Sequence, residues 1–442
     1  MKLVKTIQNI WRIEELKSRI LTTVFFIILY RLGTFIVLPG IDPGALTALQ
    51  DQTRGGLLAL LDMFSGGAFS NASIFALGIM PYISASIVMQ LMAIVVPSFQ
   101  KMQREGESGR RKINQWTRYL TILILLFQAP IYLINLQQNL VQAGSALPSG
   151  LWFRATCTVI LTAGSMFTLW LGERITDKGI GNGVSFIILV GIIARLPQSL
   201  VNEFTLRFTT SGGLFLFIAE MLVLLAVIAG AILLVQGTRR VPVQYAKKIV
   251  GNRQYGGARQ YIPLKVNAAN VMPIIFAQAI MFIPLSFMSF GNTQPSSFWQ
   301  GFLDGSGFWY NFIFALLIIV FTYFYTAVTI NPGQMADDLK RNNGFIPGIK
   351  PGKATKEYLD DVMSKITLPG AIFLAIVAIL PAFARLFNVS PEFAQFFGGT
   401  SLIILVGVVL DTLQQIESHL LMHHYDGLLE TGRIKGRSSG AY

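Results

Sequence analysis

The chain has 442 residues, of which 53% are hydrophobic and only 13% charged, whereas about a quarter of the residues in a soluble domain are charged. This composition excludes a soluble globular protein and predicts a single polytopic membrane bundle. The one cysteine, Cys157, excludes a disulfide framework and a cysteine-bound metal site.

Residues 1–19 are polar, basic and amphipathic, and are predicted to be a cytoplasmic segment rather than a cleavable signal peptide. Apolar runs about long enough to cross a bilayer follow, separated by polar or turn-rich segments. They predict ten spans, near residues 20–38, 74–96, 119–137, 152–171, 184–201, 213–235, 269–290, 308–330, 366–387 and 399–421. An even number of spans places both termini on the same side of the membrane.

The stretch before the second span is unusual. Residues 63–71 (MFSGGAFSN) are glycine-rich, too weakly apolar to span a membrane and too apolar for an ordinary loop. Such backbone is tolerated at membrane depth only where protein buries it or where it lines a watery cavity. We therefore expect a re-entrant half-helix that precedes a true span at residues 74–96. An interfacial helix that lies on the lipid is the alternative.

Charge orients the predicted bundle. Most of the 35 Lys and Arg residues lie in the N-terminal segment, in alternate loops and in the C-terminal tail, which the positive-inside rule places in the cytoplasm. This asymmetry also accounts for the net charge of +13 without nucleic-acid binding. Four arginines fall within spans or at their outer ends, where their long side chains are expected to reach the membrane surface: Arg31, Arg154, Arg195 and Arg385.

Two cytoplasmic loops are longer than a connection requires. Residues 237–266 alternate basic, aromatic and β-branched residues, and predict a protruding hairpin with Gly256-Gly257 near its tip. Residues 331–365 contain expected turns at Pro332-Gly333, Pro347-Gly348 and Pro351-Gly352. Simple anchoring by positive charge is one interpretation. Docking of a large cytoplasmic partner, either ribosomal RNA or an acidic protein surface, is the other.

Catalytic and coupling chemistry is poorly represented, so the sequence predicts neither an enzyme nor a cofactor or metal site. Glu220 and Asp411 are isolated carboxylates in separate spans, where pairing or an interfacial position is more usual than a proton relay. The cluster of His419, His423 and His424 lacks an evident third metal ligand. An ion-coupled small-solute transporter and an intramembrane enzyme are therefore alternatives without strong support.

Aliphatic residues also recur beside helix-breaking or small residues in four spans. Ile79 and Ile83 flank Pro81, and Val184 and Ile188 follow a Gly-Asn-Gly sequence. Residues four apart share a helix face. Taken by itself, this pattern favours ordinary packing.

Six segments together resemble the bacterial SecY family, the channel subunit of the Sec protein translocon. The resemblance extends from about Leu16 to Tyr425, with the motifs in family order. The segments are FSGGAFSNASIFALGIMPYISASIVMQL, EGESGRRKINQWTRY, LGERITDKGIGNG, PLKVNAANVMP, NPGQMADDLKRNNGFIPGIKPG and FGGTSLIILV.

The resemblance implies an all-α membrane protein in which two inverted halves of five spans, residues 20–201 and 213–421, are hinged at an outer loop, residues 202–212. A re-entrant plug helix at residues 55–71 closes an hourglass pore between the halves. The family's plug positions correspond here to Met63, Phe64, Ser65, Gly66, Gly67, Ser70 and Asn71. Its apolar pore ring corresponds to Ile79, Ile83, Val184, Ile188, Ile275 and Ile404.

The resemblance also implies a lateral gate that opens toward membrane lipid, with polar positions Ser84, Gln128 and Asn267. Its expected partners are the small membrane subunits SecE and SecG, the SecA motor ATPase, the ribosome and signal-bearing precursor polypeptides. The two cytoplasmic loops and the tail, residues 422–442, would dock the motor and the ribosome. The implied docking residues are Arg239, Arg240, Lys247, Lys248, Arg253, Lys350 and Tyr425. The implied location is the bacterial plasma membrane, with both termini in the cytoplasm.

Overall fold

The computed structural model describes residues 11, 13–41, 44, 46, 62–142, 150–209, 213–245, 248–250, 253–255, 259–269, 271–288 and 307–430. The side chains of 104, 138–139, 141–142, 248–250, 253–255, 259, 282–288 and 421–430 are excepted. Each of the ten predicted spans coincides with a helix. These helices are α2 (Glu14–Gly33), α5 (Met80–Val95), α7 (Glu107–Gln142), α8 (Leu151–Lys178), α9 (Gly183–Phe208), α10 (Gly213–Gln236), α11 (Met272–Met288), α13 (Phe308–Thr329), α15 (Lys353–Leu386) and α17 (Gly399–Glu430).

Within the described residues, seven helices are long and apolar enough to cross a membrane. An eighth candidate is the pair formed by α5 and α6 (Pro97–Arg104), which are bent by 103°. The bend falls at Val96, whose extended backbone precedes Pro97, because proline disfavours helical conformation in the residue before it. Helix α2 begins in the charged sequence EELKSR and α11 has only 17 residues. By length and composition, α2 and α11 are therefore weaker candidates for membrane spans than the sequence predicted.

Several predicted span boundaries were wrong, because the end of an apolar run does not mark the end of a helix. The second span begins at Met80 rather than at residue 74, since Gly78 has a φ of +53° and residues 74–79 form turns. Helices α7 and α15 run past their apolar runs into the cytoplasmic segments. Helix α9 continues to Phe208, so most of the predicted outer loop (202–212) is helical, and residues 210–212 lie outside the described part.

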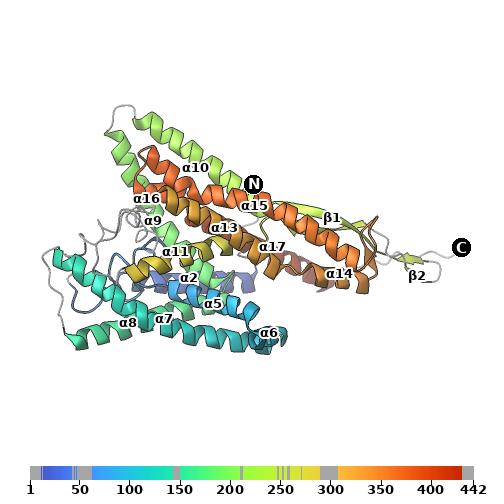
Figure 1. Cartoon of the computed structure of the whole chain (residues 1–442), viewed down its shortest axis with the longest axis horizontal. Helices are drawn as coiled ribbons and strands as arrows, with labels where there is room; N and C mark the ends of the chain where they lie inside the picture. The colour runs from blue at the N-terminus through green and yellow to red at the C-terminus, as the bar shows by residue number, and fades with distance from the viewer. Residues whose placement is uncertain are drawn as a thin grey trace.

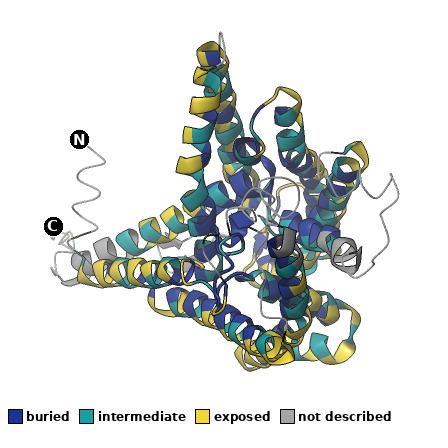
Figure 2. Cartoon of the chain, turned by 90° about the vertical axis from the view of Figure 1, so that its left-hand side faces the viewer, coloured by how far each residue is buried: buried dark blue, intermediate teal, exposed yellow. Residues whose placement is uncertain are grey.

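The helices form two groups that lie along the two sides of the molecule in Figure 1. In one group, α5 packs on α7, α7 on α8, and α8 on both α2 and α9. In the other, α13 packs on α11 and α15, and α17 on α10 and α15. The groups meet where α9 contacts α10 and α17 and where α11 contacts α5. Buried residues are concentrated in the middle of the end-on view, between the groups (Figure 2).

The outer ends of the two groups are joined through a short segment before α17. Helix α16 (Pro391–Ala394) and the 3₁₀ turn η2 (Gln395–Phe397) contact α9, α10, α15 and α17. Phe393 and Phe397 are buried with their rings edge to face at 5.2 Å. This aromatic pair gives the short segment an apolar anchor among the four surrounding helices.

The two long loops that the sequence predicts to be cytoplasmic form one folded unit, which we call the cytoplasmic unit, at the far end of the molecule from the start of α8 (Figure 1). Strand β1 (Thr238–Tyr245) pairs antiparallel with β4 (Arg259–Lys265) and also with β5 (Gly344–Phe345) from the second loop. An apolar cluster joins the sheet to α14 (Pro332–Arg341) and to the start of α15, and comprises Val241, Val243, Leu264, Leu339, Ile346, Leu359 and Met363.

The hairpin prediction is confirmed for β1 and β4. Strands β2 (Lys248–Val250) and β3 (Arg253–Tyr255) also pair, with Val250 opposite Arg253, and the predicted tip at Gly256-Gly257 lies outside the described residues. One detail of the second loop was wrong, because Pro332-Gly333 begins a helix instead of a turn. The Asn331 side chain accepts hydrogen bonds from the N–H groups of Gly333 and Gln334, at 3.0 and 3.3 Å, and so caps α14.

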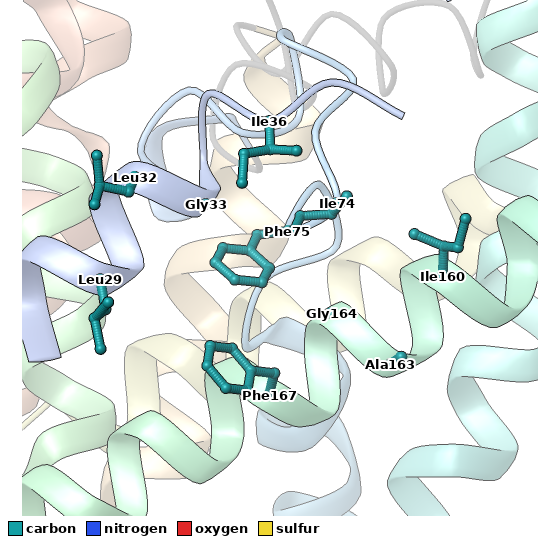
Figure 3. Close-up of a pocket in the computed structure, with 10 residues that line it drawn as sticks. All are labelled: Leu29, Leu32, Gly33, Ile36, Ile74, Phe75, Ile160, Ala163, Gly164 and Phe167. Atoms are coloured by element: carbon teal, nitrogen blue, oxygen red, sulfur yellow. The ribbon is translucent and has the colours of Figure 1, made fainter. Parts of the chain in front are cut away.

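The segment before α5 is wedged between helices α2 and α8 by one aromatic ring. Phe75 stacks on Tyr30 and on Phe167, with ring centroids 6.1 and 5.9 Å apart. Figure 3 shows the ring between Gly33 and Gly164, where an apolar cavity of about 550 Å³ opens beside it. A Cβ at Gly164 would lie 2.0 Å from the carbonyl oxygen of Ile74, so glycine is required for this close approach.

We predict that Gly164→Ala destabilises the protein by about 1–3 kcal/mol, because backbone would have to move away from backbone. Gly230→Ala in α10 is the matched control, since the new Cβ there would meet only the tip of the Phe373 ring, at 3.1 Å. Thermal unfolding of both variants in detergent or nanodiscs provides the comparison. Equal melting temperatures for the two variants would contradict the packing at Gly164.

Candidate functional site

The six predicted pore-ring residues converge on one apolar cluster between the two helix groups. Ile79, Ile83, Ile188 and Ile404 are buried within it, and Val184 and Ile275 are partly buried against it. They come from the start of α5, from α9, from α11 and from α17, which are far apart in the sequence. Packing of α9 on α17 and of α11 on α5 brings these positions together.

The predicted plug residues enter the same cluster. Met63, Phe64 and Ala68 are buried in it together with the pore-ring residues. We call residues 55–71 the plug segment; residues 55–61 of it lie outside the described part. The described plug segment therefore sits against the apolar ring, as the resemblance implies.

The described part of the plug segment holds only the end of a helix, and the remainder of the expected half-helix, residues 55–61, lies outside the described residues. Residues 62–64 are helical, and residues 65–79 are turns with one isolated bridge at Ser73. Gly66 and Gly67 have φ angles of +66° and +91°, which belong to the left-handed region and prevent the helix from continuing beyond residue 64. Glycine is needed at both positions, because other residues rarely adopt such angles.

The polar groups of this irregular backbone are largely satisfied by the segment itself. The N–H of Gly67 donates to the Asp62 carbonyl at 2.8 Å, and the N–H of Phe69 donates to the Ser65 hydroxyl at 3.0 Å. The Asp62 carboxylate accepts from the N–H of Ser70 at 2.8 Å. Because an unpaired backbone group is costly in an apolar interior, these bonds make the turns possible at this depth.

Side chains of α2 and α7 supply further donors to the plug segment. The Tyr30 hydroxyl donates to the carbonyl of Ser65 at 3.0 Å, and the Arg31 guanidinium donates to the carbonyl of Gly66 at 2.8 Å. From α7, the Tyr132 hydroxyl donates to the carbonyl of Phe69 at 2.9 Å. Tyr132 also packs edge to face on the Phe69 ring, with centroids 4.9 Å apart.

Helix α9 contributes an ion pair. The Arg195 guanidinium binds the Asp62 carboxylate and donates to the Ser70 hydroxyl at 2.8 Å. The expectation that Arg31 and Arg195 extend toward the membrane surface was therefore wrong. Both point into the bundle because the plug segment offers acceptors there, which stabilise a cation more than the lipid interior can.

The three predicted lateral-gate residues lie at neighbouring elements. Ser84 is on α5 and Gln128 on α7, two helices that pack together, and both side chains are partly buried. Asn267 is buried just before α11, which contacts α5. Their placement is compatible with a shared seam between α5–α7 and α11, and their role stays a prediction.

The predicted docking residues lie on the cytoplasmic unit and on α17. Arg239 and Arg240 are exposed on β1, and Lys350 is exposed in the turn before α15. Lys248, Arg253 and Tyr425 lie in β2, β3 and α17, where only the backbone is described, and Lys247 lies outside the described residues. The exposed arginines and Lys350 place positive charge on this unit, which also carries exposed carboxylates on α14 and at the start of α15.

Glu220 is paired rather than isolated. Arg207 binds Glu220 at 2.6 Å and Glu203 at 2.9 Å, and it also donates to the carbonyl of Asn388 at 3.0 Å. Glu203 in turn accepts from the N–H of Ser390 at 2.9 Å. This buried triad joins the ends of α9, α10 and α15. Its charged groups bind one another, which suits a structural role and not an open proton path.

Sequence reasoning missed the residues that hold the plug segment. Tyr30, Arg31, Tyr132, Asp62 and Arg195 were not singled out as a set. One signal was available: a cation within an apolar run is costly and needs a partner, and Asp62 borders the plug segment. Nothing in residue spacing, however, connects Asp62 with a residue 133 positions away.

Comparisons with known proteins agree with this architecture. The family model described as SecY matches residues 73–413. The protein translocase subunit SecY of Thermotoga maritima is 40% identical over 437 residues, which cover 97% of this chain and 99% of the relative. A solved structure of a protein conducting channel aligns with a TM-score of 0.62 at 17% identity, covering 91% of this chain and 92% of that chain. Sec61 in the canine ribosome-channel complex from the endoplasmic reticulum aligns with a TM-score of 0.58 at 16% identity, covering 91% and 92%.

We predict that Tyr132→Phe loosens the plug segment, because the carbonyl of Phe69 loses one of its two donors and keeps only the N–H of Ala72, at 3.2 Å. A hydrogen bond of this kind contributes about 0.5–1.5 kcal/mol, so amide exchange of residues 69–73 should accelerate roughly two- to tenfold. Tyr119→Phe, the same substitution at a 65% exposed position on the same helix, is the control. Hydrogen exchange with mass spectrometry gives the measurement, and unchanged exchange in Tyr132→Phe would count against this anchor.

Proposed function

The chain belongs to the SecY family of protein translocase subunits, and from that membership we propose how its parts serve protein transport. It is a multi-pass membrane protein and the protein-conducting channel subunit of a translocon. The observation that carries the assignment of parts is the convergence of six aliphatic residues and the plug segment on one apolar cluster.

The proposed pore is the interface between the two helix groups, residues 20–201 and 213–421. Ile79, Ile83, Val184 and Ile188 would form one side of its narrowest part, and Ile275 and Ile404 the other. Apolar side chains of this kind can adapt to a passing polypeptide of any sequence. In the resting channel the same constriction resists ions, because an apolar constriction disfavours water.

The proposed plug is residues 55–71. Its burial against the ring supports a role as a stopper, and its backbone bonds to Tyr30, Arg31 and Tyr132 support a defined resting position. Opening would require both the apolar contacts and these hydrogen bonds to be broken. The segment from the end of α9 into residues 210–212 would act as the hinge between the halves.

Lateral release is proposed to occur between α5–α7 and α11–α13. Ser84, Gln128 and Asn267 lie on or beside three of these helices and would stabilise the closed seam. Neutral hydrogen bonds between membrane helices are worth about 1 kcal/mol each, which an entering signal sequence can displace. Such a segment would then partition into lipid, where each leucine-like residue is favoured by about 0.3–0.6 kcal/mol and a lysine opposed by about 3 kcal/mol.

The cytoplasmic unit is the proposed docking surface for the ribosome and for the SecA motor. The Sec61 neighbour is part of a ribosome-channel complex, which supports a ribosome as partner. Exposed Arg239, Arg240 and Lys350 would meet RNA phosphates or an acidic protein surface. SecE and SecG are the proposed membrane partners. The proposed location is the bacterial plasma membrane with both termini in the cytoplasm, and the distribution of Lys and Arg supports that orientation.

A secondary transporter is the alternative that the carboxylates could have favoured. Glu203 and Glu220 are both bound by the Arg207 guanidinium. A carboxylate that carries a coupling proton has to exchange it with water, which this pairing opposes. The triad therefore favours a structural role for these residues.

We predict that proteoliposomes containing the chain, its small partners and the motor with ATP will protect a signal-bearing precursor from added protease. Ile79→Asp combined with Ile404→Asp should abolish protection, because two carboxylates would face the narrowest part of the path. Ile79→Leu with Ile404→Leu keeps the ring apolar and should retain it. If the unaltered chain gives no protection although every partner is active, the secondary transporter becomes the favoured function.

We further predict that deletion of residues 55–71 raises the resting ion conductance of the channel in planar bilayers. Without the segment, only the apolar ring would separate the two aqueous spaces. Lys353→Ser, a substitution at an exposed side chain at the start of α15, is a control that leaves the plug segment in place. An unchanged resting conductance after the deletion would refute the plug assignment. The transport function would still be tested by the protease assay.

A further inference from the structure

One charged pair connects the plug segment to a membrane helix. Arg195 on α9 binds the Asp62 carboxylate with one guanidinium nitrogen, which also donates to the Ser70 hydroxyl at 2.8 Å. The Asp62 side chain is 10% exposed and that of Arg195 31% exposed. A cation and a carboxylate inside an apolar bundle are each expensive to keep, and each loses its compensation when the other leaves.

Asp62 also shapes the segment that it anchors. Its second carboxylate oxygen accepts from the N–H of Ser70 at 2.8 Å, and its carbonyl accepts from the N–H of Gly67 at 2.8 Å and from the Ser65 hydroxyl at 3.0 Å. The same residue thus closes the turn from 62 to 70 and presents a negative charge to α9. Displacement of the turn would therefore carry this charge with it as a unit.

The seat on α9 is a close backbone contact. A Cβ at Gly191, one helical turn before Arg195, would lie 2.8 Å from the carbonyl oxygen of Phe64. A Cβ at Gly67, whose φ is +91°, would lie 3.0 Å from the Arg195 guanidinium. The segment can approach the helix this closely only because both positions are glycine, and the approach is what places the two charges in contact.

We propose that Asp62 and Arg195 form an ionic latch that holds the plug segment in its closed position, which makes Arg195 a positioning residue for gating. The proposal rests on the proposed function, since it assumes that displacement of the plug segment opens the channel. Apolar contacts with the ring are non-directional and tolerate small movements. The ion pair has one geometry and weakens steeply once water enters.

This dependence on water gives the latch two states. In the closed channel Asp62 is largely buried, so the attraction between the charges is stronger than it would be in bulk water. When a polypeptide and water occupy the pore, both charges are hydrated and the attraction falls. The pair therefore opposes spontaneous opening but resists little after opening has begun.

A double-mutant cycle tests the latch. The variants are Asp62→Asn, Arg195→Gln and the two combined, each assembled with the small partner subunits and measured as resting conductance in planar bilayers. We expect each single variant to raise resting conductance about tenfold, as a shift in the population of the open plug. The combined variant should leak no more than either single one, because both remove the same interaction. Arg154→Gln, which removes only a bond to Gln137 at 2.7 Å on the outer side, is the control.

Thermal unfolding accompanies every variant. If Arg195→Gln melts at a lower temperature, Arg195→Lys separates the two explanations. If the latch depends on charge, the resting conductance of Arg195→Lys stays within about twofold of that of the original chain. If only packing matters, Arg195→Lys conducts as much as Arg195→Gln. Additive effects in the cycle, or unchanged conductance in both folded single variants, overturn the latch. Protection of a precursor by the unaltered chain tests separately whether the chain transports proteins. Failure of the latch can therefore be distinguished from failure of the proposed function.

Discussion

Irregular backbone inside a membrane-spanning bundle must find its hydrogen-bond partners within the protein, and the rest of this structure follows from how residues 62–79 do so. Their N–H and carbonyl groups bond to one another, to the Asp62 and Ser65 side chains, and to donors on the surrounding helices. Even the end of the segment is held, because the Thr168 hydroxyl donates to the carbonyl of Gly78 at 3.3 Å. Without these partners the same residues could not occupy the centre of the bundle.

The centre combines two kinds of interaction that do different work. Apolar residues from both helix groups exclude water and tolerate rearrangement, since burial energy depends on area and not on direction. Hydrogen bonds from Tyr30, Arg31 and Tyr132 specify one position for the plug segment. These three donors and Arg195 all belong to the group formed by α2, α5, α7, α8 and α9. A separation of the two groups would therefore weaken the apolar contacts first, and displacement of the plug segment would still have to break its bonds to this one group.

The cytoplasmic unit is joined to the bundle by one continuous helix. Leu359 and Met363 near the start of α15 belong to the cytoplasmic apolar cluster, whereas Leu374 and Val377 further along belong to a cluster within the bundle. Helix α15, which contains Pro369 between these two clusters, connects the cytoplasmic unit to the α13 contacts in the bundle without an intervening loop. The pairing of β1 with β5 makes the two long loops respond together.

The sequence alone determined the class of protein, the positions of ten helices, the hairpin in the first long loop and the resemblance to a channel family. Each of these depends on local composition or on long runs of apolar residues, whose energetic preference for lipid is independent of the fold. It also supplied the six ring positions, but only through family resemblance, since aliphatic residues four apart are equally suited to ordinary packing. What only the tertiary structure decided was the conformation of residues 62–79, which are turns after residue 64, and the partners of Arg195, Asp62 and Arg207. Glycine permits the left-handed angles at residues 66 and 67, but the close approach of Gly66 to the backbone of Gly191, and the ion pairs between residues distant in sequence, exist only once packing has brought them together.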